Sequence, residues 1–297
     1  MQERPTLQAI PAFGSNPGRL VMKSYVPANL PNQPALVVVL HGCRQTAESL
    51  NAASGFSKLA KDRGFVLLYP EQTRSNNLQR CFNWFRPSEV ARDRGELLFI
   101  RQMIDHALKH HRAYRARVYI VGLSAGGAMT GALVANYPDM FAGAAIVAGM
   151  PVGAVRDAIS ALRAMKSGAP APAAGWGARI AEVSPGRRAW PPISIWQGTA
   201  DRTVTPANAL CCVDQWVEAS GLERSAGRVD KKPWGALSTW SAGSGAQVSL
   251  YSIDRMGHGL PVKESRSAGS RSKDPFVLGA GISAPAELMR LWRLSRR

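Results

Sequence analysis

A serine stands among glycines in the segment Gly-Leu-Ser-Ala-Gly-Gly, residues 122–127. A short apolar run, 118–121, precedes it, and the pattern that follows predicts a helix over 125–136. A G-x-S-x-G segment between a strand and a helix turns so sharply that the serine takes a strained backbone and its neighbours must be small. The motif therefore predicts a nucleophilic Ser124 above the edge of a sheet. The alternative is a tight glycine turn whose serine has no chemical role.

Short β-like runs alternate with helical patterns along the 297 residues, which predicts a mostly parallel central sheet flanked by helices. With 45% apolar residues, the chain is long enough to bury a large core. We expect one α/β domain over 1–297, with 153–192 as a candidate insertion over the active face and 265–273 as a flexible loop. The segment 234–240 predicts a small hairpin arm or a loop. The expected strands are 19–26, 35–40, 65–69, 118–121, 142–148, 193–196 and 248–253, and the expected helices are 46–63, 95–111, 125–136, 207–219 and 286–294.

A serine hydroxyl needs a base, and the base needs a carboxylate that orients it. For a serine on such a turn, the chain order is Ser, then Asp or Glu, then His. Of the five histidines, only His258 follows Ser124. It lies in a glycine-containing turn after the expected strand 248–253, so we predict that His258 is the base. A plain loop histidine is the alternative.

The orienting acid is expected between the serine and the histidine. Asp201 follows the predicted strand 193–196 across a short turn, at the strand end where open α/β sheets place catalytic groups. Asp254, close in sequence to His258, is the main rival, and a turn-capping role for Asp201 is the structural alternative. The remaining aspartates lie in helical patterns, at a helix exit or in a charged run: Asp139, Asp157, Asp214 and Asp230.

Acyl transfer also needs two preorganised N–H donors for the oxyanion. Ala125, directly after the serine, is predicted to supply one of them. The loop after the strand 35–40 reads His41-Gly42-Cys43, and we expect the second donor to be the N–H of Cys43. His41 is expected to order this loop and is also a candidate for contact with substrate.

Aromatic residues supply further candidates for substrate contact. Trp84 and Phe85 lie in a loop after a predicted strand end, and Trp196 lies in the strand 193–196. Packing in the core or in loops is the alternative for each of them. No metal and no cofactor are expected, because a serine, a histidine and an aspartate carry the chemistry alone.

The formal charge of the chain is +17, from 37 Lys and Arg against 20 Asp and Glu. Such a field favours anionic surfaces. No nucleic-acid recognition motif accompanies the charge, so nucleic acid is not an expected partner. A binder of granules or polyanions on a hydrolase scaffold is the competing interpretation from another class.

The N-terminal residues lack the unbroken apolar stretch of a secretory signal, and the longest apolar run, 35–40, is too short for a membrane span. We therefore expect a cytoplasmic protein, with secretion after removal of a leader as the alternative. The four cysteines fit no zinc spacing. The sequence allows one disulfide, between Cys43 and Cys81, and equally allows free thiols.

Six motifs stand in order along the chain: Leu-His-Gly-Cys-Arg-Gln-Thr-Ala (40–47), Tyr-Pro-Glu-Gln (69–72), Cys-Phe-Asn-Trp-Phe (81–85), Gly-Leu-Ser-Ala-Gly-Gly-Ala-Met (122–129), Gly-Thr-Ala-Asp-Arg-Thr-Val (198–204) and Gly-His (257–258). Together they resemble the esterase/polyhydroxybutyrate depolymerase family. The resemblance runs from about Gly18 to the final helix. It implies an α/β-hydrolase fold, cleavage of hydroxyalkanoate-type polyesters or oligoesters, and the triad Ser124, Asp201 and His258, while related enzymes act on feruloyl and acetylxylan esters.

The chain departs from the family pattern in two places. It reads Gly-Leu-Pro-Val at 259–262, where Trp-Ser-Gly-Gly often follows the histidine, so we expect an altered wall beside His258. Phe82 stands where Trp is frequent. Since relatives that degrade crystalline polymer add a linker and an adsorbing module, amorphous granules, soluble oligomers or small esters are the expected substrates.

Overall fold

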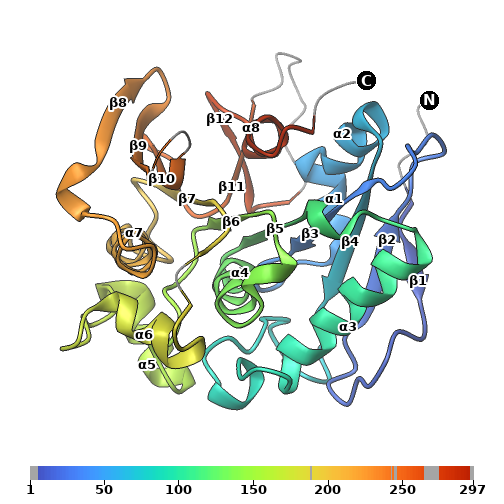
Figure 1. The fold of residues 1–297 in the computed structure, drawn as a ribbon, viewed down its shortest axis with the longest axis horizontal. Coiled ribbons are helices and arrows are strands. Elements are labelled where there is room, and N and C mark those ends of the chain that lie inside the picture. The colour runs from blue at the N-terminus through green and yellow to red at the C-terminus, as the bar shows by residue number, and fades with distance from the viewer. Residues whose placement is uncertain (1–5, 188, 242, 244–245, 264–273, 295–297) are drawn as a thin grey trace.

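A computed structural model of the chain describes residues 6–187, 189–241, 243, 246–263 and 274–294. Its centre is a ten-stranded sheet in the order β1-β2-β4-β3-β5-β6-β7-β10-β9-β8 (Figure 1). The six strands from β4 to β10 in this order are parallel, and antiparallel pairs extend both edges. The strands are β1 Gln8–Ile10, β2 Val21–Tyr25, β3 Ala35–Leu40, β4 Phe65–Glu71, β5 Val118–Leu123, β6 Gly143–Val147, β7 Ile193–Gly198, β8 Arg228–Lys232, β9 Gly235–Ser241 and β10 Ala246–Ile253.

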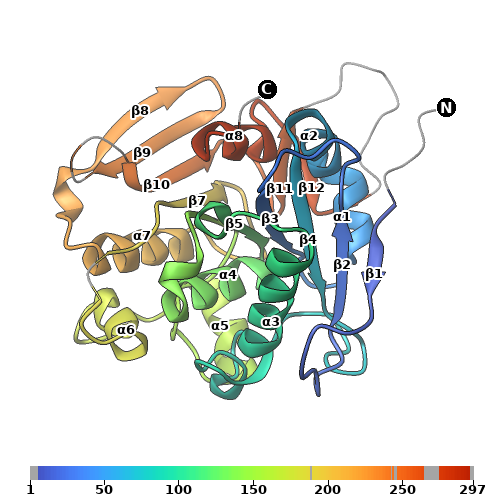
Figure 2. The same ribbon diagram turned by 45° about the vertical axis from the view of Figure 1, so that its right-hand side comes forward.

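Helices cover both faces of the sheet, which confirms the predicted fold class (Figure 2). Alternate side chains of β3 show why: Val38 packs toward α3, α4 and α7, whereas Val37 packs toward α1, α2 and α8. A strand buried on both sides needs the continuous apolar run that its sequence has. The helices are α1 Ala47–Ser54, α2 Phe56–Arg63, α3 Gly95–His110, α4 Ala125–Asn136, α5 Ala158–Ser167, α6 Trp176–Val183, α7 Ala207–Ala219 and α8 Ala284–Leu291.

Two elements near the C-terminus differ from the expected pattern. A separate two-stranded parallel sheet, β11 Leu260–Lys263 with β12 Val277–Ala280, was not predicted and follows directly after His258. The predicted hairpin arm at 234–240 corresponds to β9, which pairs with β8. This hairpin extends the sheet beyond β10 (Figure 1). The expected loop 265–273 lies outside the described residues.

Predicted boundaries were wrong at several elements, and two of them have a clear physical reason. The single helix 46–63 is two helices, because Gly55 adopts a left-handed conformation with φ 78° and ends α1. The strand expected to stop before Pro70 continues to Glu71, with Pro70 opposite Met22 of the antiparallel neighbour β2. Within the candidate insertion 153–192, α6 begins at Trp176, whose buried side chain anchors the helix.

In the part of the chain that the structure describes, no helix has the length and apolar character needed to cross a bilayer.

Candidate active site

Ser124 occupies the turn between β5 and α4, with φ 56° and ψ −117°. Its N–H donates to the carbonyl of Val147 at 2.8 Å, which ties the turn to the neighbouring strand β6. A Cβ atom at Gly122 would lie 2.1 Å from the carbonyl oxygen of Gly126, and one at Gly126 would lie 2.5 Å from that of Leu40. Only glycine fits at both positions, so the strained turn depends on the spacing of the motif.

Asp201 follows β7 and His258 follows β10, and these two strands are parallel neighbours. Nδ1 of His258 lies 2.7 Å from Oδ2 of Asp201. The other carboxylate oxygen accepts the N–H groups of Thr203 and Val204 at 2.8 and 2.9 Å. Because the carboxylate accepts, Nδ1 carries the ring proton and Nε2 is left as the basic nitrogen.

Several contacts keep Asp201 ionised. Burial alone would raise its pKa, but the hydrogen bond and the charge of His258, together with the N–H groups of Val204 and Thr203, outweigh burial and lower the pKa below its ordinary value. Gln197, which the sequence analysis missed, adds a fourth donor with Nε2 3.1 Å from Oδ2.

The turn that carries His258 packs directly on the end of β7. A Cβ atom at Gly198 would lie 2.3 Å from the carbonyl oxygen of Met256, so the two backbones touch there. The ring of Phe276 meets the imidazole edge-on at 6.3 Å. Asp254, the rival acid, is exposed, and its N–H donates to Trp234. The structure thus brings Asp201, and not Asp254, to the histidine.

The predicted oxyanion loop lies against the serine turn. A Cβ atom at Gly42 would be 3.4 Å from Cβ of Ser124, so the loop and the serine are in contact distance. The N–H of Gly42 donates to Oε1 of Gln45 at 2.7 Å. Cys43 forms a disulfide with Cys81, the bridge that the sequence allowed. Ala125 is the first residue of α4, directly after Ser124.

The four aromatic and imidazole candidates for substrate contact separate into two groups. Trp196 is 0% exposed, stacks on Tyr251 with ring centroids 3.8 Å apart and donates Nε1–H to Ser194. His41 is 1% exposed. Both are interior side chains, so the expectation that they contact substrate is corrected by their burial. Trp84 and Phe85 are half-buried and meet edge-to-face at 5.8 Å.

One buried charge was not anticipated. Glu96, on the second residue of α3, is 0% exposed and accepts hydrogen bonds from the side chains of Gln72, Asn76 and Asn83. An acidic residue beside Leu97 on the apolar stripe of a predicted helix was the available signal. The partners come from a separate loop, which periodicity cannot reveal.

Comparison with known proteins assigns the chain to a family. The family model described as esterase PHB depolymerase matches residues 21–231. The poly(3-hydroxyalkanoate) depolymerase C of Paucimonas lemoignei is 39% identical over 264 residues, which are 88% of this chain and 64% of that protein. This chain thus spans just under two thirds of that relative's length. Feruloyl esterase B of Neurospora crassa is 31% identical over 268 residues, covering 87% of this chain and 90% of the relative.

Solved structures share the fold. The acetyl xylan esterase from Aspergillus awamori superposes with a TM-score of 0.80 at 22% identity, over 98% of this chain and 100% of that one. The poly(3-hydroxybutyrate) depolymerase from Bordetella parapertussis gives a TM-score of 0.54 at 15% identity, over 86% of each chain. Both confirm the expected α/β-hydrolase fold. By its family match and its 39% identity to the Paucimonas lemoignei depolymerase, the chain belongs to the esterase PHB depolymerase family of carboxylic ester hydrolases, as its six motifs predicted.

Proposed function

We propose that the chain is a serine hydrolase of hydroxyalkanoate-type polyesters or oligoesters, with Ser124 as nucleophile, His258 as base and Asp201 as orienting acid. The observation that carries this proposal is the 2.7 Å contact between His258 and the buried Asp201. It lies at the carboxyl ends of β7 and β10. Only β6 separates β7 from β5, the strand that leads into Ser124, and two strand spacings amount to about 10 Å.

The reaction follows from these roles. His258 Nε2 removes the proton of Ser124 as the hydroxyl attacks the ester carbonyl, and the N–H groups of Cys43 and Ala125 stabilise the oxyanion. His258 then protonates the leaving alcohol, and water repeats the sequence on the acyl-enzyme. Among the described residues no hydrogen bond joins Ser124 to His258; catalytic contacts of free enzymes are often long and tighten with substrate bound.

The polyester assignment rests on degree of identity. The relative named as a poly(3-hydroxyalkanoate) depolymerase is 39% identical, against 31% for the Neurospora crassa feruloyl esterase and 29% for the probable acetylxylan esterase A of Aspergillus clavatus. A carbohydrate ester hydrolase that releases feruloyl or acetyl groups is the second candidate. The fold match with an acetyl xylan esterase favours it only as far as architecture.

We further propose that residues 153–192 form a wall of the substrate site within one catalytic domain. Ala164 of α5 packs with Val204 of the Asp201 loop and with Ala128 of α4 in one apolar cluster, against which Trp84 also packs. The N–H of Thr205 donates to the carbonyl of Met165 at 2.8 Å. These contacts join the segment to the Asp201 loop and, through Trp84, to the loop of Trp84 and Phe85.

Covalent labelling tests the nucleophile. A fluorophosphonate probe should modify the wild-type protein, and peptide mapping should find the label on Ser124, while Ser124→Ala stays unlabelled. Labelling at another residue, or equal labelling of Ser124→Ala, would contradict the proposal. If the wild-type protein is not labelled at all, but binds granules with an affinity that falls steeply as salt is added, the polyanion-binding interpretation is favoured instead.

A turnover panel tests the substrate. Hydroxybutyrate oligomers, methyl ferulate and acetylated xylan oligomers are compared at equal ester concentration with the same enzyme preparation. The proposal expects the highest kcat/KM on hydroxybutyrate oligomers. A higher kcat/KM on either carbohydrate-type ester would transfer the assignment to the second candidate.

A further inference from the structure

The buried carboxylate of Glu96 has no part in the proposed proton transfers, yet every described contact of its two oxygens is with a nitrogen donor. Oε1 accepts from Gln72 Nε2 at 2.7 Å, from Asn76 Nδ2 at 2.9 Å and from Asn83 Nδ2 at 2.6 Å. Oε2 accepts the backbone N–H of Asn83 at 2.8 Å. A carboxylate at the start of α3 therefore holds residues from both ends of the loop 72–83, which follows β4.

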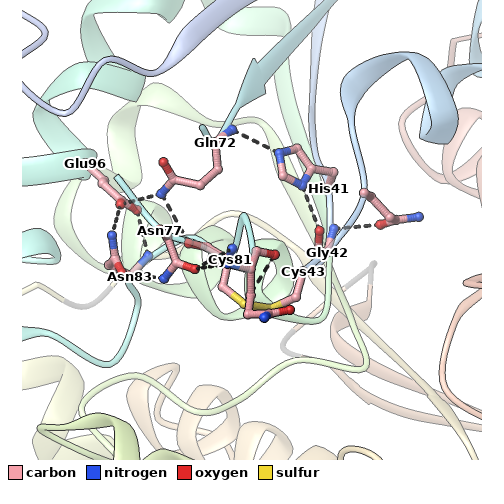
Figure 3. Close-up of a disulfide and its surroundings, with 10 residues drawn as sticks. His41, Gly42, Cys43, Gln72, Asn77, Cys81, Asn83 and Glu96 are labelled. Carbon is pink, nitrogen blue, oxygen red and sulfur yellow. Dashed lines mark hydrogen bonds between the residues drawn. A yellow bond between two sulfur atoms is a disulfide. The ribbon is translucent and has the colours of Figure 1, made fainter. Parts of the chain in front are cut away.

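One branch of these contacts leads from Gln72 to the predicted oxyanion loop (Figure 3). The backbone N–H of Gln72 donates to His41 Nε2 at 3.0 Å, so the ring carries its proton on Nδ1. That proton is donated to the carbonyl oxygen of Gly42 at 2.7 Å. Burial lowers the pKa of His41, which keeps the ring in the neutral form that both contacts require.

The contact on the Gly42 carbonyl has a geometric consequence. The peptide bond between Gly42 and Cys43 is trans and planar, so its C=O and its N–H point in opposite directions. Holding the carbonyl on His41 therefore sets the direction of the Cys43 N–H, the proposed oxyanion donor.

The other branch leads to the loop that carries the half-exposed aromatic residues. Asn83, whose backbone and side chain both donate to Glu96, directly precedes Trp84 and Phe85. Gln72 Nε2 also donates to the carbonyl of Cys81 at 3.1 Å. The disulfide between Cys81 and Cys43 then joins the loop of Trp84 and Phe85 covalently to the predicted oxyanion loop (Figure 3).

We propose that Glu96 is a positioning residue for ester hydrolysis: through Gln72 and His41 it fixes the direction of the Cys43 N–H, and through Asn83 it fixes the aromatic loop beside it. This inference rests on the proposed function. It predicts that an isosteric loss of the carboxylate damages the transition state more than the binding of substrate.

The test is Glu96→Gln, which keeps the volume of the side chain. Both oxygens of Glu96 accept from N–H groups. In Glu96→Gln the side-chain NH₂ group replaces one of these oxygens, so a donor faces a donor at whichever position it takes. Assays with a short-chain p-nitrophenyl ester run at pH 8, above the pKa of about 7 to which burial raises Glu96. We expect kcat to fall about tenfold to a hundredfold, as for a small misplacement of a catalytic group, with KM changed less than about threefold.

A transition-state analogue gives an independent measurement. A boronic acid adds to a serine hydroxyl as a tetrahedral anion, so its affinity depends on the oxyanion donors. The inhibition constant of phenylboronic acid should rise in Glu96→Gln by the same factor by which kcat/KM falls. An unchanged inhibition constant, or a loss seen only in KM, would overturn the inference.

Controls separate positioning from loss of structure. Leu108→Ala removes a buried side chain from the same helix, remote from the network, and should lower the unfolding temperature while leaving kcat within about twofold. If Leu108→Ala lowers kcat as much as Glu96→Gln does, the effect is structural and the inference fails. Should Glu96→Gln not fold, Gln72→Met removes the side-chain amide that joins Gln72 to Glu96 and keeps the backbone N–H that donates to His41. It must give the same kcat-selective loss.

Ser124→Ala, assayed beside these variants, distinguishes failure of the proposed function from failure of the positioning role. Full turnover by Ser124→Ala would end the proposed function itself. Inactive Ser124→Ala with wild-type behaviour of Glu96→Gln would end only the positioning role.

Discussion

Nδ1 of His258 lies 2.7 Å from Oδ2 of Asp201, although the two residues are 57 positions apart in the chain. The carboxylate side chain is 0% exposed and the imidazole 8% exposed, so water competes little for this hydrogen bond. A buried, ionised acceptor beside one ring nitrogen determines the tautomer of the neutral ring, in which the other nitrogen is the one that can accept a proton.

Asp201→Asn should therefore keep the fold and lose the reaction. An asparagine amide can donate to Nδ1, which stabilises the tautomer with its proton on Nε2, and the expected loss of kcat is about 10⁴-fold. Ester turnover and the circular dichroism spectrum are measured together. Asp254→Asn is the matched control, since Asp254 is exposed, and it should retain wild-type turnover. Loss of turnover in the control alone would assign the acid to Asp254.

Gly126→Ala should destabilise the serine turn. The new methyl group would lie 2.5 Å from the carbonyl oxygen of Leu40, a backbone atom that cannot move aside cheaply, and we expect a loss of about 3 kcal/mol or more in the free energy of unfolding. Gly131→Ala on the same helix meets its nearest atom, on Val152, at 3.3 Å and should change stability by less than about 1 kcal/mol. Urea unfolding compares the two variants. Equal stability in both would refute the steric account.

Glu96 should make stability depend on pH in the direction opposite to Asp201. Burial raises the pKa of Glu96 from 4.5 to about 7, so the folded state keeps this proton to higher pH than the unfolded state does. Its contribution is present below pH 4.5 and is lost as the pH rises through 7. The lowered pKa of Asp201 contributes stability that is lost only as the pH falls below its ordinary value of 3.8.

The wild-type free energy of unfolding, relative to that of Glu96→Gln, should accordingly fall by about 3 kcal/mol between pH 4.5 and 8. Urea titrations followed by tryptophan fluorescence at intervals across this range give the difference. Parallel curves for the two proteins would show that the carboxyl group does not titrate there.

Trp196→Phe should affect stability and not substrate. The indole stacks on Tyr251 and its Nε1–H donates to Oγ of Ser194. We therefore expect a loss of about 1–3 kcal/mol in the free energy of unfolding, with KM unchanged. Phe85→Ala, in the half-exposed aromatic loop, should do the reverse and raise KM with little change in stability. A raised KM in Trp196→Phe alone would restore the original expectation for that residue.

Removing the disulfide tests the connection between the oxyanion loop and the aromatic loop. The cysteines are 38 positions apart, for which chain entropy gives about 4 kcal/mol of stabilisation. The double variant Cys43→Ser, Cys81→Ser should lose about that much and should also lose turnover. Cys211→Ser, at a free cysteine, is the control and should keep both. If the double variant keeps wild-type turnover at a temperature at which it is folded, the disulfide is not needed for catalysis.

Local patterns predicted the fold well, and they led to the three proposed catalytic residues because each pattern left few alternatives. Ser124 lies in a motif that only one backbone geometry accommodates, and His258 is the only histidine after it. Trp196 was misjudged because an apolar strand looks the same whether a side chain faces the core or a cleft. The hydrophobic pattern predicted one helix over 46–63, but Gly55 divides it into α1 and α2. A single left-handed residue leaves the hydrophobic pattern intact, so the pattern could not reveal the break. The partners of Glu96 lie 13 to 24 positions away in a loop without periodicity.

The bridge between Cys43 and Cys81 also bears on where active protein can be made. Cells that keep cytosolic thiols reduced with glutathione and thioredoxin would deliver this chain without the bond, whereas the bacterial periplasm or a culture supernatant would deliver it oxidised. We therefore expect the specific activity of a recombinant preparation to depend on the expression compartment and on the reductant in the buffer.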